Sequence, residues 1–435
     1  MKTTNDSGIK IEVHLIQNFA PSNLNRDDSG QPKSATFGGC RRARISSQCS
    51  KQSVRRKGPM GELLEKQGAV RTRLLITEIA KMIDGKNDPD EKVIETVAGV
   101  FEAGGLERPA KRGGKVKQTT THREEAGDEQ GDDSSEIAGE RESKNTTKIL
   151  VFLDKEALPK IVKVLKDNWT DLTKGKKETK DVARDKVGQL LFEAAKAPDI
   201  ALFGRMLEVK SSTPFGKYNM RIEAACQVAH PISTHKVDME MDFYTAVDDL
   251  NPAEETGAGM MGVVGFNSAC YYRYAVVDRD QLARNLARKT ERANGAWTQP
   301  LEPKDYEEAD KVIEAFLEAM VYAIPTGKQN SFAAQNLPSF GLFVRRKGGV
   351  PISLANAFAK PVRPAKDDDD LVGLSVKRLT EHWEALKKVY GDQGVVGTSC
   401  FHVQQQGRLN GLTDSDKGSV TEAIKTIMDA SGGGQ

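Results

Sequence analysis

Apolar and polar residues alternate near the start of the chain, and this period of two predicts a β-strand. Residues 9–16, IKIEVHLI, carry aliphatic side chains at every second position, with Lys10, Glu12 and His14 between them. Successive side chains of a strand point to opposite faces. The pattern therefore predicts a half-buried strand whose polar side chains lie on the face opposite the core.

Residues 237–244 show the same alternation, and residues 268–277 are the expected return partner of this strand. The segment between them is long and rich in glycine, which favours a mobile tip over a tight turn. We therefore expect these two strands to form a projecting hairpin. The continuous apolar run of residues 148–154 predicts one further strand, buried on both faces.

Apolar residues spaced three and four positions apart predict amphipathic helices in much of the remaining chain. The clearest lie at residues 309–323 and 377–390, and helical segments are also expected within 60–103, 156–168 and 180–197. Strands and helices together predict an α+β fold.

The periodic pattern disappears between about residues 104 and 146, which predicts a flexible insertion. Within it, residues 123–142 hold nine acids and two arginines, a net charge of −7. The whole chain carries only +2, so the remainder carries +9. A basic body favours a polyanionic partner, although some metabolic enzymes are equally basic.

The composition of the 435-residue chain, 38% apolar and 29% charged, is that of a soluble globular protein. Neither a run of eighteen apolar residues nor a secretory signal is found, so no membrane span is expected and the cytoplasm is the expected location. The five cysteines are odd in number and form no CxxC pair. This predicts reduced thiols and argues against a zinc cluster.

Positive charge is concentrated in one short stretch near the N-terminus. Seven Lys and Arg, and no acid, lie between Cys40 and Lys57. Ser46 or Ser47 can cap a helix here, and Gly58-Pro59 is a stop signal after it.

On a helix from Gln48 to Lys57, the side chains of Gln48, Lys51 and Arg55 fall on one face. Like charges at this spacing repel, and a solvated surface helix normally mixes both signs. A surface that binds a polyanion is therefore favoured over a basic helix without function. Lys, Arg, Ser and Gln are the side chains that hold phosphates without reading sequence.

Motifs for nucleotide hydrolysis fail on inspection. Gly327-Lys328 lacks the glycine that a Walker A loop requires at position 322, which is Tyr, and Gln329 replaces the magnesium-binding Ser or Thr. A nucleoside triphosphate site is not expected.

Metal chemistry has little support in the sequence. His230 and His235 are separated by a proline and lie near no third ligand, so we predict no metal and no cofactor. Asp248 and Asp249 leave one alternative open, a ribonuclease that cleaves phosphodiesters through a metal ion.

Several blocks of the sequence resemble one known family. They are NLNRDDSGQPKSATFGGCRRARISSQCSKQSVR (23–55), DIALFGRM (199–206), VAHPISTHKVDMEMDFYTAVDDL (228–250), ACYYRYAVV (269–277) and PISLANAFAKPV (351–362). In this order they resemble the backbone subunit of type I-E CRISPR surveillance complexes (Cascade), known as CasC, within the RAMP superfamily. The resemblance extends over roughly residues 9–362.

The resemblance implies a ferredoxin-like, RRM-related palm with an inserted helical finger domain and a projecting β-hairpin thumb. It assigns the palm to residues 1–59, 198–237 and 272–430, the finger to 60–197 with the insertion 104–146, the thumb to 238–271 and a loose tail to 431–435. Copies would stack head to tail along one CRISPR guide RNA (crRNA), beside other Cascade subunits. Base pairing of the guide with target DNA would supply specificity in antiviral defence, and no catalysis is expected.

The resemblance also assigns residues that contact the guide RNA. They are Arg26, Lys33, Ser46, Gln48, Lys51, Arg55, Met206 and, more weakly, Lys328; the basic stretch adds Arg41, Arg42 and Arg44. Met206, in a loop after Gly204-Arg205, is expected to press against a base, although a lone methionine more often packs in a core. Phe243 and Tyr244 are expected to pack the hairpin base.

The finger is the part least similar to the family. A contact between target DNA and its lysines (Lys174, Lys176, Lys177 and Lys180) is accordingly only a suggestion. A second alternative also stays open, that of a basic structural or ribosome-associated protein without a guide.

Overall fold

The computed structural model describes residues 8–109, 145–207, 209–246, 260–365, 370–403, 409 and 411–429. Most of the expected insertion, the hairpin tip with Asp248 and Asp249, and the tail 431–435 lie outside these ranges. Among the described residues, no helix is both long and apolar enough to cross a membrane.

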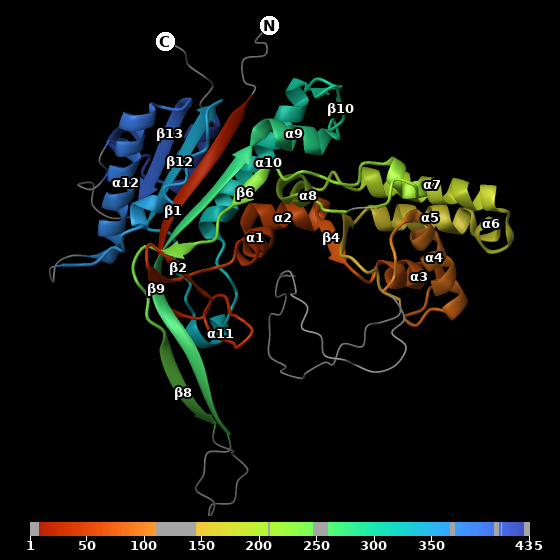
Figure 1. Cartoon of the computed structure of the whole chain (residues 1–435), viewed down its shortest axis with the longest axis horizontal. Helices are drawn as coiled ribbons and strands as arrows, with labels where there is room; N and C mark the ends of the chain where they lie inside the picture. The colour runs from red at the N-terminus through yellow and green to blue at the C-terminus, as the bar shows by residue number, and fades with distance from the viewer. Residues whose placement is uncertain are drawn as a thin grey trace, which may run out of the picture.

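An antiparallel sheet organises the chain, with the strand order β13-β12-β1-β9-β6 (Figure 1). Its members are β1 (Ile9–Ser22), β6 (Cys226–Val228), β9 (Met260–Asp278), β12 (Phe340–Lys347) and β13 (Val395–His402), and short β7 (Ile232–Ser233) also pairs with β9. β1 lies at the centre, where Val13 pairs with Phe343 of β12 and Ala275 of β9.

Helices cover both faces of this sheet. On one face, the aliphatic residues of β1 pack with Val312 and Phe316 in a large core. On the other face, Tyr272 and Leu342 pack with Trp383 in a second core. The helices of the first core are α1 (Ser47–Arg56), α2 (Gly58–Gln67), α8 (Pro198–Phe203), α9 (Arg279–Ala287), α10 (Pro303–Tyr322) and α13 (Val420–Asp429), whereas α12 (Leu371–Tyr390) covers the second face.

The strand expected at residues 9–16 is confirmed, but the expected half-burial is wrong. Glu12 and His14 are completely buried. The Glu12 carboxylate accepts hydrogen bonds from Arg346 Nε at 3.1 Å and from the Ile352 N–H at 2.7 Å. The polar face of β1 is therefore buried in a hydrogen-bonded network under the second layer, because buried charges require such partners.

A second module of helices has its own core, which contains Ile79, Phe101, Leu165 and Phe215. It comprises β4 (Ala69–Thr72), α3 (Leu75–Asp84), α4 (Glu91–Gly104), β5 (Val151–Asp154), α5 (Ala157–Asp167), α6 (Trp169–Lys174), α7 (Lys177–Glu193) and the 3₁₀ turn η1 (Pro214–Lys217). It extends to one side of the sheet in Figure 1. The expected finger, residues 60–197, includes most of α2. In the structure α2 packs in the first core, to which Met60 belongs, and not in the second module.

Two arginines lie near the junction of the two modules, Arg205 buried and Arg288 half-buried. Arg205 donates to the carbonyl oxygens of Met220 and Leu191, at 3.0 and 3.1 Å. Arg288 lies over the ring of Phe192, 4.2 Å from its centroid, and its guanidinium nitrogens are shielded without a hydrogen-bond partner in the described part of the chain. Burial lowers the pKa of Arg288 to about 10 and that of Arg205 to about 9.

The predicted hairpin is confirmed within the described residues. β8 (Glu240–Ala246) pairs with the first part of β9, where Glu240 lies opposite Phe266, and the same strand then enters the central sheet. Figure 1 shows this hairpin projecting away from the sheet. Phe243 is 79% exposed, so the expectation that it packs the hairpin base is wrong.

The remaining elements are short. They are β2 (Ser34–Phe37), β3 (Cys40–Ala43), β10 (Arg292–Ala293), β11 (Ala296–Trp297), α11 (Gln329–Phe332), and the 3₁₀ turns η2 (Ala355–Phe358) and η4 (Thr413–Ser415).

Candidate nucleic-acid interface

The basic helix predicted near the N-terminus is α1, and Ser46 is its cap. Ser46 has extended backbone angles, and its hydroxyl oxygen accepts from the Cys49 N–H at 3.2 Å. The Ser46 N–H donates to the side-chain oxygen of Asn25 at 2.8 Å. This bond fixes the start of α1 to the loop that contains Arg26 and Lys33.

A small core beneath this loop brings together segments far apart in the sequence. It contains Phe19, Leu24, Ile45, Tyr271 and Ile324. Thus the end of β1, the loop after it, the start of α1, β9 and the segment after α10 meet at one place.

Lys328 reaches the same region through a close backbone approach. A Cβ atom on Gly327 would overlap the carbonyl oxygen of Leu24, so only glycine allows this contact. Lys328 itself has a left-handed backbone, with φ of 49°, at the start of α11. Tertiary packing therefore places the segment of Lys328 beside Asn23 and Leu24, just before the loop 25–33.

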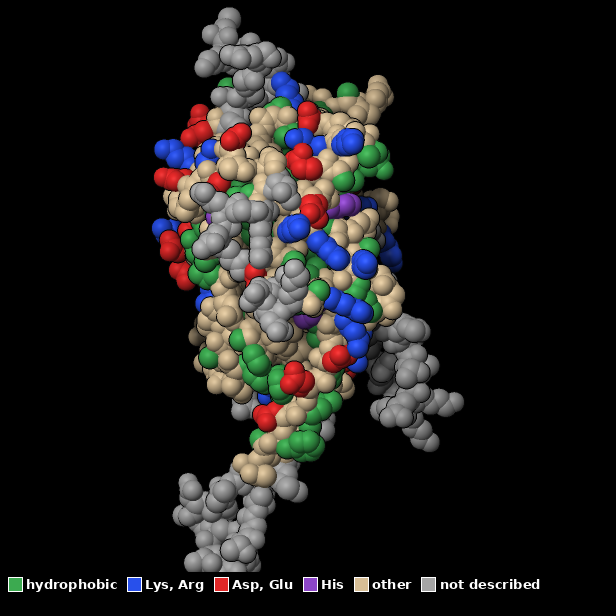
Figure 2. Space-filling view, turned by 90° about the vertical axis from the view of Figure 1, so that its left-hand side faces the viewer, with side chains coloured by type: hydrophobic (Ala, Val, Ile, Leu, Met, Phe, Trp, Pro, Cys, Tyr) green, Lys and Arg blue, Asp and Glu red, His purple; other side chains and the backbone are tan. Residues whose placement is uncertain are grey.

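Most of the predicted cations of this surface are not salt-bridged within the described residues, although Lys33 lies close enough to Asp27 to contribute to the lowered pKa of that carboxyl. Arg26, Lys33, Arg41, Lys51 and Lys328 form no salt bridge with the described residues, and all are at least partly exposed. Figure 2 views the molecule from the side of α12 and β13, away from α1, and shows Lys and Arg side chains along one edge of that face. Cations that are not neutralised together produce a positive potential that attracts phosphates.

Residues on the exposed face of α1 agree with the predicted helix face. Gln48 is exposed, and Lys51 is partly exposed with its Nζ 5.5 Å from the centroid of the Phe203 ring. Cys49 faces the small core instead, and burial raises the pKa of its thiol to about 11. Lys51 is thus positioned by an aromatic ring while its charge stays available.

Arg55 has a partner that sequence reasoning missed. Its guanidinium forms a salt bridge with Asp199, with Nη2 2.7 Å from Oδ2, and its side chain remains 22% exposed. Asp199 is fully buried and also accepts from the Ala69 N–H at 3.2 Å. Burial raises the pKa of this carboxyl, and the Arg55 charge opposes that rise. Asp199 begins the block DIALFGRM, but nothing local indicated that it would meet α1.

Arg42 contradicts the prediction that it contacts RNA. It is completely buried, and its guanidinium donates to the carbonyl oxygens of Phe37, Ser233, Phe358 and Ala359 at 3.2, 3.1, 2.7 and 3.3 Å. Its neighbour Arg41 is exposed because adjacent residues of a strand point to opposite faces. Arg42 therefore ties three segments together and offers no donor to a ligand.

Two further predicted contacts also have structural partners. Arg44 is half-buried, with Nη1 3.0 Å from His230 Nδ1. Ser46 is 6% exposed and its hydroxyl caps α1. Arg44 and Ser46 were both expected to contact the guide RNA, but their side chains already form hydrogen bonds within the fold.

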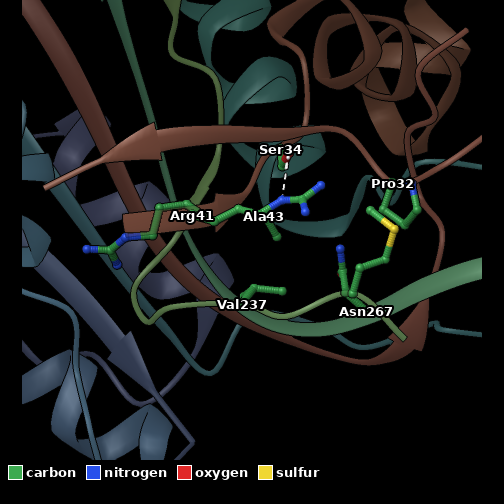
Figure 3. Close-up of a pocket in the computed structure, with 8 residues that line it drawn as sticks. Pro32, Ser34, Arg41, Ala43, Val237 and Asn267 are labelled. Carbon is green, nitrogen blue, oxygen red and sulfur yellow. Dashed lines mark hydrogen bonds between the residues drawn. The ribbon is translucent and has the colours of Figure 1, made fainter. Parts of the chain in front are cut away.

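The hairpin β2–β3 borders a small hollow beside the base of the projecting hairpin. Figure 3 shows Ser34, Arg41 and Ala43 on one side, with Val237 and Asn267 across from them. Ser34 accepts a hydrogen bond from Arg41 Nε at 3.2 Å. The hollow measures about 10 Å³, enough for a single water molecule but not for a base. Contacts of Arg41 would consequently be made on an open surface.

Met206 lies on the surface. It is 77% exposed, which excludes the core-packing interpretation. The preceding residue is fixed, because Arg205 and Ile222 exchange backbone hydrogen bonds of 3.0 and 2.9 Å. An exposed thioether on a fixed backbone suits contact with a flat apolar group such as a base.

Other residues considered from sequence fall elsewhere. His235 is engaged by the fold: the Cys270 N–H donates to its Nε2 at 3.2 Å, and its Nδ1 lies 2.8 Å from the Lys236 carbonyl oxygen. The described residues contain no cluster of three metal-ligating side chains. The lysines at 174–180 lie around the α6–α7 turn, in the second module.

Comparison with known proteins identifies the family of the chain. Residues 11–428 match a Cas family described as CT1975-like protein. The chain belongs to this CT1975-like Cas family. The match confirms the expectation of a CRISPR-associated protein. No curated protein sequence matches the chain.

Solved structures support the same assignment for this chain. It is 26% identical to a chain of a "CRISPR RNA-guided surveillance complex, pre-nicking", with a TM-score of 0.71 and coverage of 97% of this chain and 99% of the other. A chain of another "CRISPR RNA-guided surveillance complex" shares the fold at 21% identity, with a TM-score of 0.53 and coverage of 97% and 99%. Each similarity extends over nearly the full length of both chains.

Proposed function

We propose that this protein is the guide-RNA-binding backbone subunit of a type I-E CRISPR surveillance complex, a CasC-like protein. The observation that carries this proposal is the surface around α1, where cations without salt bridges among the described residues, from loop 25–33, α1 and the segment at Lys328, lie together. Phosphates of a single strand provide the complementary charge. Full-length similarity to a chain of an RNA-guided complex supports the same role.

The sheet supports the palm of this proposal. Its order β12-β1-β9-β6, with α1 and α2 after β1 and α9 and α10 after β9, suits the ferredoxin-like, RRM-related arrangement. The second module would be the finger and the β8–β9 hairpin the thumb. The thumb would cross the guide on the next copy, where exposed Phe243 and the neighbour's Met206 offer apolar contacts at a kinked base.

The protein would bind RNA without cutting it, in the cytoplasm. Copies would stack along one crRNA, contact other Cascade subunits and leave the bases free to pair with target DNA. The alternative, a ribonuclease that uses Asp248 or Asp249, involves residues outside the described ranges. Incubating the assembled complex with target RNA and magnesium separates the two, because intact RNA rejects the ribonuclease.

The central experiment measures RNA binding of the purified protein as a function of salt. The variant Lys51→Ala should weaken binding about tenfold, and the salt slope should fall by about 0.7 for each phosphate that is no longer neutralised. The control Lys425→Ala removes an exposed cation of α13 that forms no ion pair with the described residues, and it should leave binding unchanged. Equal effects of the two variants, or no salt dependence in the wild type, would refute the proposed surface.

Sequencing of the RNA that co-purifies with the protein tests its identity. Guides of uniform length with repeat-derived ends are expected. A mixture of cellular RNA would favour the ribosome-associated alternative instead.

A further inference from the structure

A cavity of about 310 Å³ lies at the junction of the sheet and the second module. α1 and α2 form one wall, the start of β4 and the residue after β5 form the other, and α8 contributes its floor. The lining residues are Gln52, Arg55, Arg56, Gly61, Leu64, Glu65, Ala69, Arg71, Lys155 and Asp199. Figure 1 shows α1, α2 and β4 adjacent at this place.

The floor of the cavity is a fixed ion pair. Asp199 is held by Arg55 and by the N–H groups of Ala69 and Ile200. The Arg55 guanidinium also lies 5.2 Å from the centroid of the Phe152 ring. The acid is therefore neutralised and covered by donors, so it does not repel an anion that enters the cavity.

Among the other charged residues of the lining, cations outnumber acids. Arg56, Arg71 and Lys155 form no ion pair among the residues that the structure describes, and Glu65 is the one further acid of the described lining. The Lys155 ammonium group donates to the Leu64 carbonyl oxygen at 3.2 Å, which holds it at the rim. Exposed cations of both modules thus line the rim of one space.

Size and charge together restrict the ligand. A volume of about 310 Å³ is at the lower limit of small-molecule sites, near that of one nucleotide and too small for a protein element. Guanidinium and ammonium groups are the side chains that proteins commonly use to bind a phosphate. Gln52 adds an amide that suits a sugar or base edge.

We propose that this cavity binds one nucleotide of the RNA strand, with its phosphate held by Arg71 and Lys155. The inference rests on the proposed RNA-binding function and extends the path of the strand from α1 onto the second module. Arg56, next to Arg55 on α1, connects the two parts of this path. A free mononucleotide has the same chemistry and is the other source to test.

The experiment uses the full-length protein with the double variant Arg71→Ala/Lys155→Ala. Its matched control, Lys163→Ala/Lys425→Ala, removes two exposed cations of α5 and α13 that form no ion pair in the described structure. Fluorescence anisotropy of a labelled single-stranded RNA is measured against salt. The cavity variant should bind at least about tenfold more weakly, with a salt slope smaller by about 0.7 per phosphate released, and the control should match the wild type.

Two further variants keep the result interpretable. The swap Arg71→Lys/Lys155→Arg preserves the charge and should restore most of the binding, which separates a direct contact from a folding defect. A photo-crosslinking residue in place of Gln52 should attach to the RNA.

Each remaining outcome is decisive. If Lys51→Ala weakens RNA binding but Arg71→Ala/Lys155→Ala behaves as the control, the cavity proposal is wrong and the proposed function stands. If the wild type binds no RNA, the proposed function itself fails. If adenosine monophosphate binds the wild type and not the cavity variant while RNA binding is unchanged, the cavity serves a free nucleotide and the RNA assignment is overturned.

Discussion

Replacing Arg42 and its neighbour Arg41 in turn tests whether Arg42 stabilises the fold while Arg41 binds RNA. In Arg42→Ala, four carbonyl oxygens are deprived of their guanidinium donor, and all lie within 3.3 Å of it in the folded protein. These oxygens belong to the β2–β3 hairpin, β7 and the segment at 358–359. The variant should therefore loosen the attachment of the hairpin to the body of the sheet.

The size of the effect follows from the burial of Arg42. A hydrogen bond to a charged group contributes about 1.5–3 kcal/mol, but the bonds share one guanidinium whose own burial is costly, so their contributions do not add. We expect Arg42→Ala to lower the free energy of unfolding by about 3–5 kcal/mol. Arg42→Lys keeps the charge but cannot reach all segments, so about half of that loss is expected.

The assay is urea unfolding followed by circular dichroism, with the midpoint compared at unchanged m-value. Arg41→Ala is the matched control, because Arg41 is exposed and its side chain forms a hydrogen bond only with Ser34 among the described residues. It should change stability by less than about 0.5 kcal/mol while weakening RNA binding. Normal stability of Arg42→Ala together with reduced RNA affinity would refute the structural role.

Three further predictions concern stability. Arg288→Met should raise the free energy of unfolding by about 1–3 kcal/mol, because it removes a half-buried charge whose nitrogens are shielded without a hydrogen-bond partner among the described residues. The cost of that charge is fully present at neutral pH, which lies below both the folded and the unfolded pKa of Arg288. Arg205→Met should instead lower the free energy of unfolding by about 2–3 kcal/mol, because carbonyl oxygens lose their donor, and urea midpoints that shift in the same direction for both variants would contradict this. Burial lowers the pKa of His235, so the free energy of unfolding should fall as the pH drops below about 6.5, by up to about 1.4 kcal/mol per pH unit. The variant His235→Gln should lose this dependence on pH between pH 7 and about 5.5. Gly38 and Gly39 both have positive φ, but a Cβ at Gly38 would overlap the carbonyl oxygen of Ala359, whereas a Cβ at Gly39 would meet open space. Gly38→Ala should therefore lower the melting temperature clearly more than Gly39→Ala. Similar losses in the two variants would show that the close approach at Gly38 is unimportant.

Local periodicity predicted the elements well. The strand at residues 9–16, the hairpin strands and the helices at 309–323 and 377–390 all exist, as β1, β8, β9, α10 and α12. The α1 cap followed from one serine before a basic run. These features depend on neighbours along the chain, which is why the sequence reveals them.

Partners across the fold could not be predicted in the same way. Asp199 meets Arg55 from 144 residues away, and Lys328 reaches the loop at Leu24 through Gly327. No local pattern encodes such contacts, because they depend on how separate elements pack. The cavity residues Arg71 and Lys155 were missed for the same reason: each is unremarkable along the chain and significant only beside α1.

The sequence by itself determined the α+β character, the basic helix with its cap and the membership of a CRISPR-associated family, since periodicity, charge and ordered motifs are written along the chain. Only the tertiary structure decided that Glu12 and His14 are buried, that Arg42 holds segments together while Arg41 faces solvent, and that cations from two modules line the rim of one cavity. The physical reason is that burial is set by what covers a side chain, and the covering residues come from distant parts of the sequence.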